Sequence, residues 1–238
     1  MMRTVRASLC VAIAAMSFAS AQEVTLTAHV RILDTEHKTE SPHAENVVVW
    51  LVPIGNPAPA QPSTKQVARL TQHNKSFEPH VLIVPVGAVV QFPNRDPFFH
   101  NVFSLFEGKR FDLGLYEAGS TRNVSFDRPG ISYIFCNIHA EMSAVVIALE
   151  TPYFGVSNRK GEIVIPRVPA GRYTMHSWYE TAPQDAIEAL VHEINVTANS
   201  STLGVLQVPA GPAAMAHKNK YGMDYEPPEP ATPAYQSR

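Results

Sequence analysis

The sequence predicts an all-β fold, because its apolar residues follow the short period of strands and no long amphipathic helical pattern is present. Residues 24–32 alternate apolar and polar side chains, and residues 47–52 form a continuous apolar run rich in valine. Proline is also frequent, at 20 of 238 residues. Together these observations predict short strands joined by turns.

Residues 1–21 predict an export signal. Arg3 and Arg6 form a basic start, residues 7–18 are apolar, and residues 19–21 are a small-residue cleavage site. We therefore expect a periplasmic or secreted protein, cleaved after Ala21, without stable membrane insertion. The chain has 19 basic and 21 acidic residues, and removal of the two signal arginines leaves 17 against 21, a net charge of −4. This balance does not indicate nucleic-acid binding.

The order of strands and turns predicts two β-domains after the signal. The first spans residues 22–150 and includes N-terminal strands and a proline-rich linker at 53–64. Its further strands are expected at 81–84, 88–92, 122–126, 131–135 and 143–149. The first two of these flank a Pro-Val-Gly turn, and the next two flank an Asp-Arg-Pro-Gly turn.

Residues 151–208 predict a second, smaller β-unit, with strands separated by Asn-Arg-Lys-Gly and Pro-Ala-Gly turns. Its expected role is structural or in docking a partner. Residues 209–238 are rich in proline, alanine and polar residues, and they predict a disordered tail. Within this tail, residues 217–225 mix charged and aromatic side chains and are a candidate docking motif, with a solvated linker as the alternative.

One short run gathers side chains that bind metals. Cys136, His139 and Met142 follow one another at intervals of three, and His100 lies 36 residues before the cysteine. They supply one thiolate, two imidazoles and one thioether, the ligand set of a blue-copper electron-transfer site. Thiolate and thioether suit Cu(I), while imidazole accepts both oxidation states, so such a site can exchange one electron without rebuilding its coordination.

Each of these residues also has a simpler interpretation. Cys10 lies in the signal, which leaves Cys136 without a disulfide partner, so Cys136 is either a metal ligand or an inert buried thiol. Met142 is either a weak axial ligand or a core-filling side chain, and Glu141 is the alternative axial donor. His80 is either a further histidine near the site or an ordinary core or surface histidine.

Residues 65–150 resemble the cupredoxin family. The resemblance rests on segments 76–94, 96–102 and 129–142, the last of which contains the short Cys-x-x-His-x-x-Met loop of amicyanin-like members. It implies a Greek-key β-sandwich. Residues 151–208 resemble a carboxypeptidase regulatory-like domain, a small transthyretin-like β-sandwich. The wider chain is also similar to exported proteins labelled methylamine utilization proteins.

The cupredoxin resemblance implies a role for each matched residue. His100 and His139 would bind copper through Nδ1, with Cys136 as the thiolate and Met142 as the long axial ligand. Asn101 would tie the two ligand loops together through side-chain hydrogen bonds.

The expected function is that of a one-electron carrier that meets a redox partner protein. We expect no enzymatic activity, because no catalytic triad, paired carboxylates or open metal position is evident. Two alternatives are copper trafficking or sensing without electron transfer, and metal-free binding by a β-sandwich.

Overall fold

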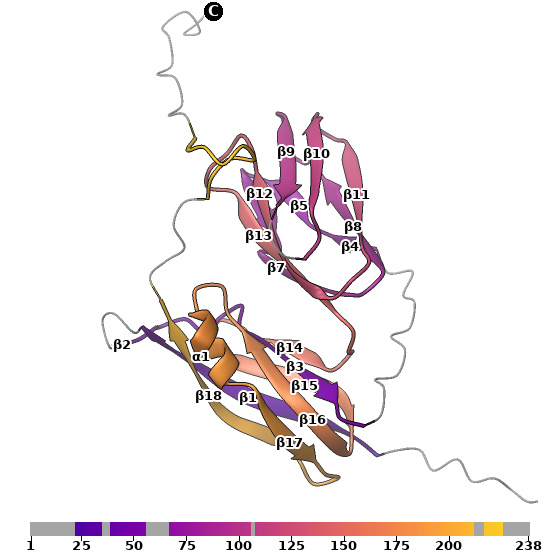
Figure 1. The fold of residues 1–238 in the computed structure, drawn as a ribbon, viewed down its shortest axis with the longest axis vertical. Helices are drawn as coiled ribbons and strands as arrows, with labels where there is room; N and C mark the ends of the chain where they lie inside the picture. Colours follow the sequence, from indigo (N-terminus) through magenta and orange to yellow (C-terminus); the bar gives the residue numbers. More distant parts are fainter. Residues whose placement is uncertain (1–21, 35–38, 56–66, 106–107, 212–216, 226–238) are drawn as a thin grey trace, which may run out of the picture.

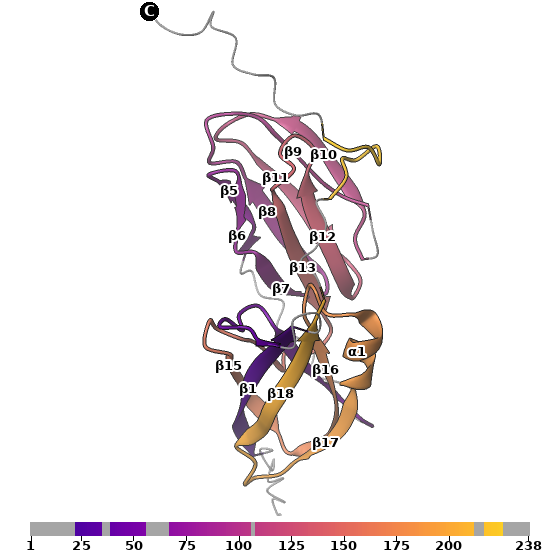
Figure 2. The same cartoon turned by 90° about the vertical axis from the view of Figure 1, so that its left-hand side faces the viewer.

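The computed structural model describes residues 22–34, 39–55, 67–105, 108–211 and 217–225. These residues form two β-sandwiches that lie one above the other in both views (Figures 1 and 2). The all-β prediction is confirmed, since a single short helix, α1 (Gln184–Ala189), accompanies the strands of the described segments. Within the same segments, no helix is long and apolar enough to cross a membrane.

The first sandwich occupies the upper part of Figure 1. Its strands are β4 (Ala68–Arg69), β5 (Thr71–His73), β6 (Ser76–Glu78), β7 (Val81–Pro85), β8 (Ala88–Pro93), β9 (His100–Ser104), β10 (Phe111–Tyr116), β11 (Thr121–Phe126), β12 (Gly130–Cys136) and β13 (Ser143–Leu149). One sheet has the order β10-β9-β12-β13-β7, another has the order β11-β8-β4, and β5 and β6 form a hairpin. Phe92, Ile134 and Val146 belong to the buried core that these strands enclose.

Five strands expected from the sequence of this sandwich are confirmed. They are β7, β8, β11, β12 and β13. In β12 the side chains alternate, so that Ile134 and Cys136 are buried while Tyr133 and Phe135 are only partly covered. This alternation directs the thiol of Cys136 into the interior of the sandwich.

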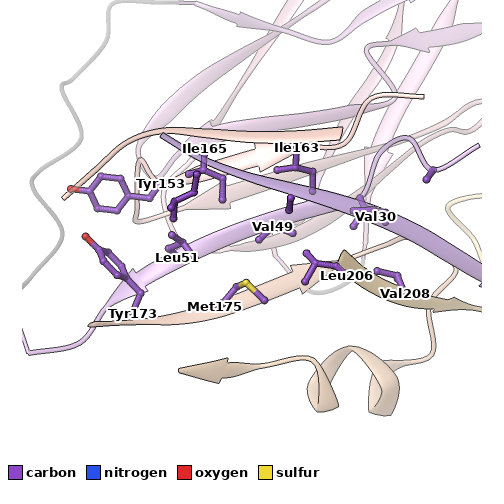
Figure 3. Close-up of a cluster of buried hydrophobic side chains, with 14 of the residues drawn as sticks. Val30, Val49, Leu51, Tyr153, Ile163, Ile165, Tyr173, Met175, Leu206 and Val208 are labelled. Atoms are coloured by element: carbon purple, nitrogen blue, oxygen red, sulfur yellow. The ribbon is translucent and has the colours of Figure 1, made fainter. Parts of the chain in front are cut away.

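The second sandwich is built from both ends of the chain. Its strands are β1 (Glu23–Asp34), β2 (Thr39–Glu40), β3 (Val48–Pro53), β14 (Phe154–Val156), β15 (Glu162–Pro169), β16 (Gly171–Trp178), β17 (His192–Val196) and β18 (Thr202–Ala210). The sheet β15-β1-β18, extended by β2, lies against the sheet β14-β3-β16-β17. Figure 3 shows their apolar side chains meeting in a common core, with Val49 and Leu51 of β3 near Ile163 and Ile165 of β15.

The pairing of β1 and β3 differs from the domain boundaries expected from the sequence, which grouped residues 22–53 with the first sandwich. β1 buries Leu26, Val30 and Ile32, and it pairs with β15 and β18 of the second sandwich. β3 pairs with β14 and β16. The first sandwich is therefore inserted between β3 and β14, and it is not an N-terminal domain. The alternating pattern of β1 shows that it needs a partner sheet, but not which one.

The C-terminal region also differs in part from the expected disordered tail. β18 continues to Ala210, and residues 217–225 lie against the first sandwich. The predicted signal at 1–21, residues 56–64 of the predicted linker, and the tail residues 212–216 and 226–238 lie outside the described residues.

An apolar cluster joins the two sandwiches. Val48 and Trp178 of the second sandwich pack in one cluster with Val145 and Ile147 of the first. Beside this cluster the Nε2 atom of His80 lies 2.6 Å from a carboxylate oxygen of Glu180, and its Nδ1 atom lies 3.2 Å from the carbonyl of Ser143. His80 therefore links the two sandwiches.

The hydrogen bond to Glu180 raises the pKa of His80, although burial opposes it. Because the folded state favours the protonated imidazole, we expect this pair to stabilise the fold by up to about 1 kcal/mol below the ordinary histidine pKa of about 6.5. The contribution should disappear as the pH rises through the raised pKa. Urea unfolding across this pH range tests the prediction, and Glu180→Gln should remove this contribution to the pH dependence. Equal pH slopes in both proteins would contradict it.

Candidate metal centre

The pairing of two strands places the candidate ligands at one end of the first sandwich. β9 and β12 are antiparallel neighbours, and Cys136 pairs with Val102. The start of β9, at His100, therefore lies beside the end of β12, at Cys136. Residues 137–142 form a tight turn before β13, closed by hydrogen bonds from the Met142 amide to the His139 carbonyl at 3.1 Å and from the Cys136 amide to the Met142 carbonyl at 3.2 Å.

Three of the four ligands predicted from the sequence meet there. The Nδ1 atoms of His100 and His139 each lie 3.6 Å from Cys136 Sγ, and the three donor atoms all lie within 4.8 Å of one another. The residues present therefore fit a metal ion of the kind that accepts imidazole and thiolate ligands. His100 and Cys136 are buried, whereas His139 is partly exposed.

The fourth predicted ligand is buried in the same core. Met142 has no exposed surface and belongs to the same core cluster as Cys136. Glu141, the alternative axial donor, is exposed. His80 does not join the donors, since its imidazole bonds to Glu180 in the second sandwich.

A buried carboxylate orients the first imidazole. Asp96 lies 2.9 Å from His100 Nε2, and it also accepts hydrogen bonds from the amides of Asn74 and Lys75 at 2.6 and 3.0 Å. Burial alone would raise the pKa of Asp96, but these hydrogen bonds lower it below its ordinary value. The ionised carboxylate fixes the ring so that Nδ1 faces the thiol, as outer hydrogen bonds do for metal-binding histidines.

The surroundings of the donors determine their protonation in the metal-free protein. Burial raises the pKa of the Cys136 thiol, although the amides of Ile138, Asn101 and His139 act in the opposite direction. Burial also lowers the pKa of His139, which favours its neutral form. A neutral imidazole can bind a metal directly, whereas the thiol must lose its proton, so metal binding releases protons here.

Asn101 does not act as expected. Its side-chain amide donates to Asp112 on β10, at 2.6 Å, rather than to the second ligand loop. The backbone joins the two loops, because the Asn137 amide donates to the Asn101 carbonyl at 2.8 Å. Backbone groups can form this link with almost any side chain present, so the identity of the residue does not reveal it.

Phe98 packs beside both imidazoles. Its ring centroid lies 5.3 Å from that of His100 and 5.4 Å from that of His139. The next residue, Phe99, is 52% exposed. The partly exposed imidazole of His139 therefore lies beside an aromatic ring.

Sequence reasoning missed two parts of the site. One is Asp96, for which a signal existed, since an acidic residue four positions before a candidate ligand histidine can reach its ring. The other is the segment 217–225, which contacts Cys136 and Asn137. Its contacts with residues 83 and 89 positions away leave no local signal in the sequence.

No family model and no curated protein matches this chain. Among solved structures it is similar to a purple cupredoxin from Nitrosopumilus maritimus, 22% identical over 34% of this chain and 99% of that chain, with a TM-score of 0.31. An oxidised amicyanin variant is 20% identical over 35% of this chain and 82% of that chain, with a TM-score of 0.33. A copper-containing nitrite reductase from Thermus scotoductus is 22% identical over 52% of this chain but 28% of its own length, with a TM-score of 0.34.

The contacts of Asp96 lead to a prediction about the metal-free protein. Asp96→Asn should lower the free energy of unfolding by about 1–3 kcal/mol, because an amide offers one acceptor oxygen to three donors where a carboxylate offers two. Urea denaturation measures this change. Asp127→Asn is the matched control, since Asp127 bonds to Lys109 at the surface. The control should change stability little, and equal losses in the two variants would refute the role of Asp96.

Proposed function

We propose that this protein is a mononuclear blue-copper protein that carries single electrons, with copper held by His100, Cys136, His139 and Met142. The observation that carries the proposal is the convergence of two imidazole Nδ1 atoms and one thiol within 4.8 Å at the end of a β-sandwich. These donor types, with a nearby thioether, match the blue-copper ligand set. The burial of Met142 and the exposure of Glu141 favour the thioether as the axial donor.

Bound copper would supply the Cu(II)/Cu(I) couple. The chain's own residues would hold the donors in one arrangement for both oxidation states, because His100 and Cys136 lie at the ends of paired strands and Asp96 restrains the ring of His100. His139 is the one partly exposed member of the proposed ligand set. Its edge, beside Phe98 and Phe99, is the proposed route for electrons to a partner protein.

The location proposed for this carrier is the periplasm or the outside of the cell. The predicted signal at residues 1–21 supports it, as does an unpaired cysteine that metal binding would protect from oxidation. A link to methylamine utilization and the existence of a redox partner protein stay predictions from the family resemblance.

The first test is optical. We expect metal-free protein to take up one Cu(II) ion and to develop an intense visible band from thiolate-to-copper charge transfer, which disappears on reduction. Cys136→Ser should abolish the band, because a hydroxyl cannot replace the thiolate as the electron donor. A colourless copper-loaded protein, or a band that survives this substitution, would overturn the proposed centre.

A second test separates electron transfer from copper storage or sensing. Ala140 follows His139 and is partly exposed, so Ala140→Glu places a carboxylate beside the proposed exit without touching a donor atom. We expect an unchanged visible spectrum but electron self-exchange slowed by about tenfold, since desolvating a carboxylate in a small redox interface costs on the order of 1–2 kcal/mol. Paramagnetic line broadening measures this rate. Unchanged self-exchange would favour a copper protein without electron transfer at this edge.

A further inference from the structure

The C-terminal segment, residues 217–225, lies against the first sandwich at the end that carries the candidate ligands (Figure 1, yellow). It comes after the last strand of the second sandwich, so it returns to the first sandwich from a distant part of the chain. The expected alternatives for these residues were a docking motif and a solvated linker. The contacts in the structure are with the ligand turn of the same chain.

The segment holds the backbone of the ligand turn directly. The hydroxyl of Tyr225 donates to the carbonyl of Cys136, at 2.5 Å. The amide of Lys220 donates to the side-chain oxygen of Asn137, at 2.9 Å. The last residue of β12 and the first residue of the turn are thus bonded to the segment, one through its backbone and one through its side chain.

Two further contacts fasten the segment in place. The imidazole of His217 stacks on Phe135, with ring centroids 4.3 Å apart, and its Nδ1 atom lies 3.1 Å from the Tyr225 hydroxyl. The ammonium of Lys220 lies 2.8 Å from Asp112, the carboxylate that also accepts a hydrogen bond from Asn101. The segment is therefore connected to both ligand loops.

The geometry explains why this cover matters for the thiol. Residues along β12 alternate between the two faces of its sheet, so Phe135 and the thiol of Cys136 lie on opposite faces. The sandwich core encloses the thiol on one face, while the C-terminal segment stacks on Phe135 on the other face and bonds to the Cys136 carbonyl. Release of the segment would free the end of β12 to fray and would let solvent reach the sulfur.

We propose that Tyr225 is a positioning residue of the metal centre, which holds the Cys136 carbonyl and thereby keeps the ligand turn closed over the thiol. Its effect on a bound metal rests on the function proposed above. Its effect on the thiol does not, because the contacts of the segment with Cys136 and Phe135 are made between protein groups.

The test measures how fast Cys136 in the metal-free protein reacts with a disulfide reagent such as dithionitrobenzoate. The full chain carries Cys10→Ser, so that Cys136 is its single cysteine. Tyr225→Phe removes the hydroxyl and keeps the ring. We expect the reaction to become about fivefold faster, the change that follows from losing one hydrogen bond of about 1 kcal/mol that opposes opening.

Tyr221→Phe is the matched control, because Tyr221 lies in the same segment and is 71% exposed. It should leave the rate unchanged. Deletion of residues 217–238 removes every contact of the segment, and it should accelerate the reaction by more than about tenfold. If the thiol of Tyr225→Phe and of the deletion variant reacts at the wild-type rate, the positioning role is wrong. It is equally wrong if Tyr221→Phe accelerates the reaction as much as Tyr225→Phe.

Copper loading tests the positioning role of Tyr225 separately from the proposed function as a copper-containing electron carrier. A shifted visible band or reduction potential in copper-loaded Tyr225→Phe, with copper still bound, supports positioning of the ligand turn. If the wild-type protein binds no copper while the thiol rates change as expected, the proposed function fails and the control of Cys136 by the segment stands. If copper binds and neither the thiol rates nor the spectrum respond, the function stands and the positioning role fails.

Discussion

The antiparallel pairing of β9 and β12 is the constraint on which the candidate centre depends. The Cys136–Val102 pair sets the register, and it brings the beginning of one strand beside the end of the other. His100 and Cys136 are thereby neighbours in space despite the 36 residues between them. His139 needs no further long-range contact, since the turn closed by the Met142 carbonyl returns it to the thiol. A slip of one residue in this register would direct the thiol to the other face of the sheet.

Hydrogen bonds and an ion pair link polar groups on both sides of the site. Asp96 satisfies His100 together with two backbone amides. On the other side, Asn101 bonds to Asp112, and Asp112 bonds to Lys220 in the C-terminal segment. Polar contacts therefore flank the donors on two sides. Asp96, in the loop before β9, makes one set of contacts. The other set joins Asn101, Asp112 and Lys220, the last of which lies in the C-terminal segment.

The insertion of one sandwich into the other has a simple geometric basis. β3 and β14 are paired neighbours, so the chain leaves and re-enters the second sandwich at nearly the same place. An insertion with adjacent ends leaves the host sheets intact. The apolar cluster around Trp178 and the bond between His80 and Glu180 then fasten the two bodies. The carbonyl of Ser143 contacts His80, and Ser143 is the residue that follows the turn at 137–142. The contact between the two sandwiches therefore begins one residue after the turn that carries His139 and Met142.

The sequence by itself determined the local features of this protein. Alternation and turn residues predicted the strands β7, β8, β11, β12 and β13, because the side-chain period of a strand and the backbone demands of proline and glycine act over a few residues. The spacing of Cys136, His139 and Met142 likewise indicated one ligand turn, since these residues lie within a single loop. The chemistry of their side chains suggested copper before any fold was known.

Only the tertiary structure decided the features that depend on distant partners. The placement of β1 in the second sandwich and the contact of Tyr225 with Cys136 each join surfaces that come together on folding. An apolar strand face or a tyrosine hydroxyl specifies that a partner is needed, but many partners would satisfy it. The choice follows from the packing of the whole chain, which minimises exposed apolar surface and unpaired polar groups together.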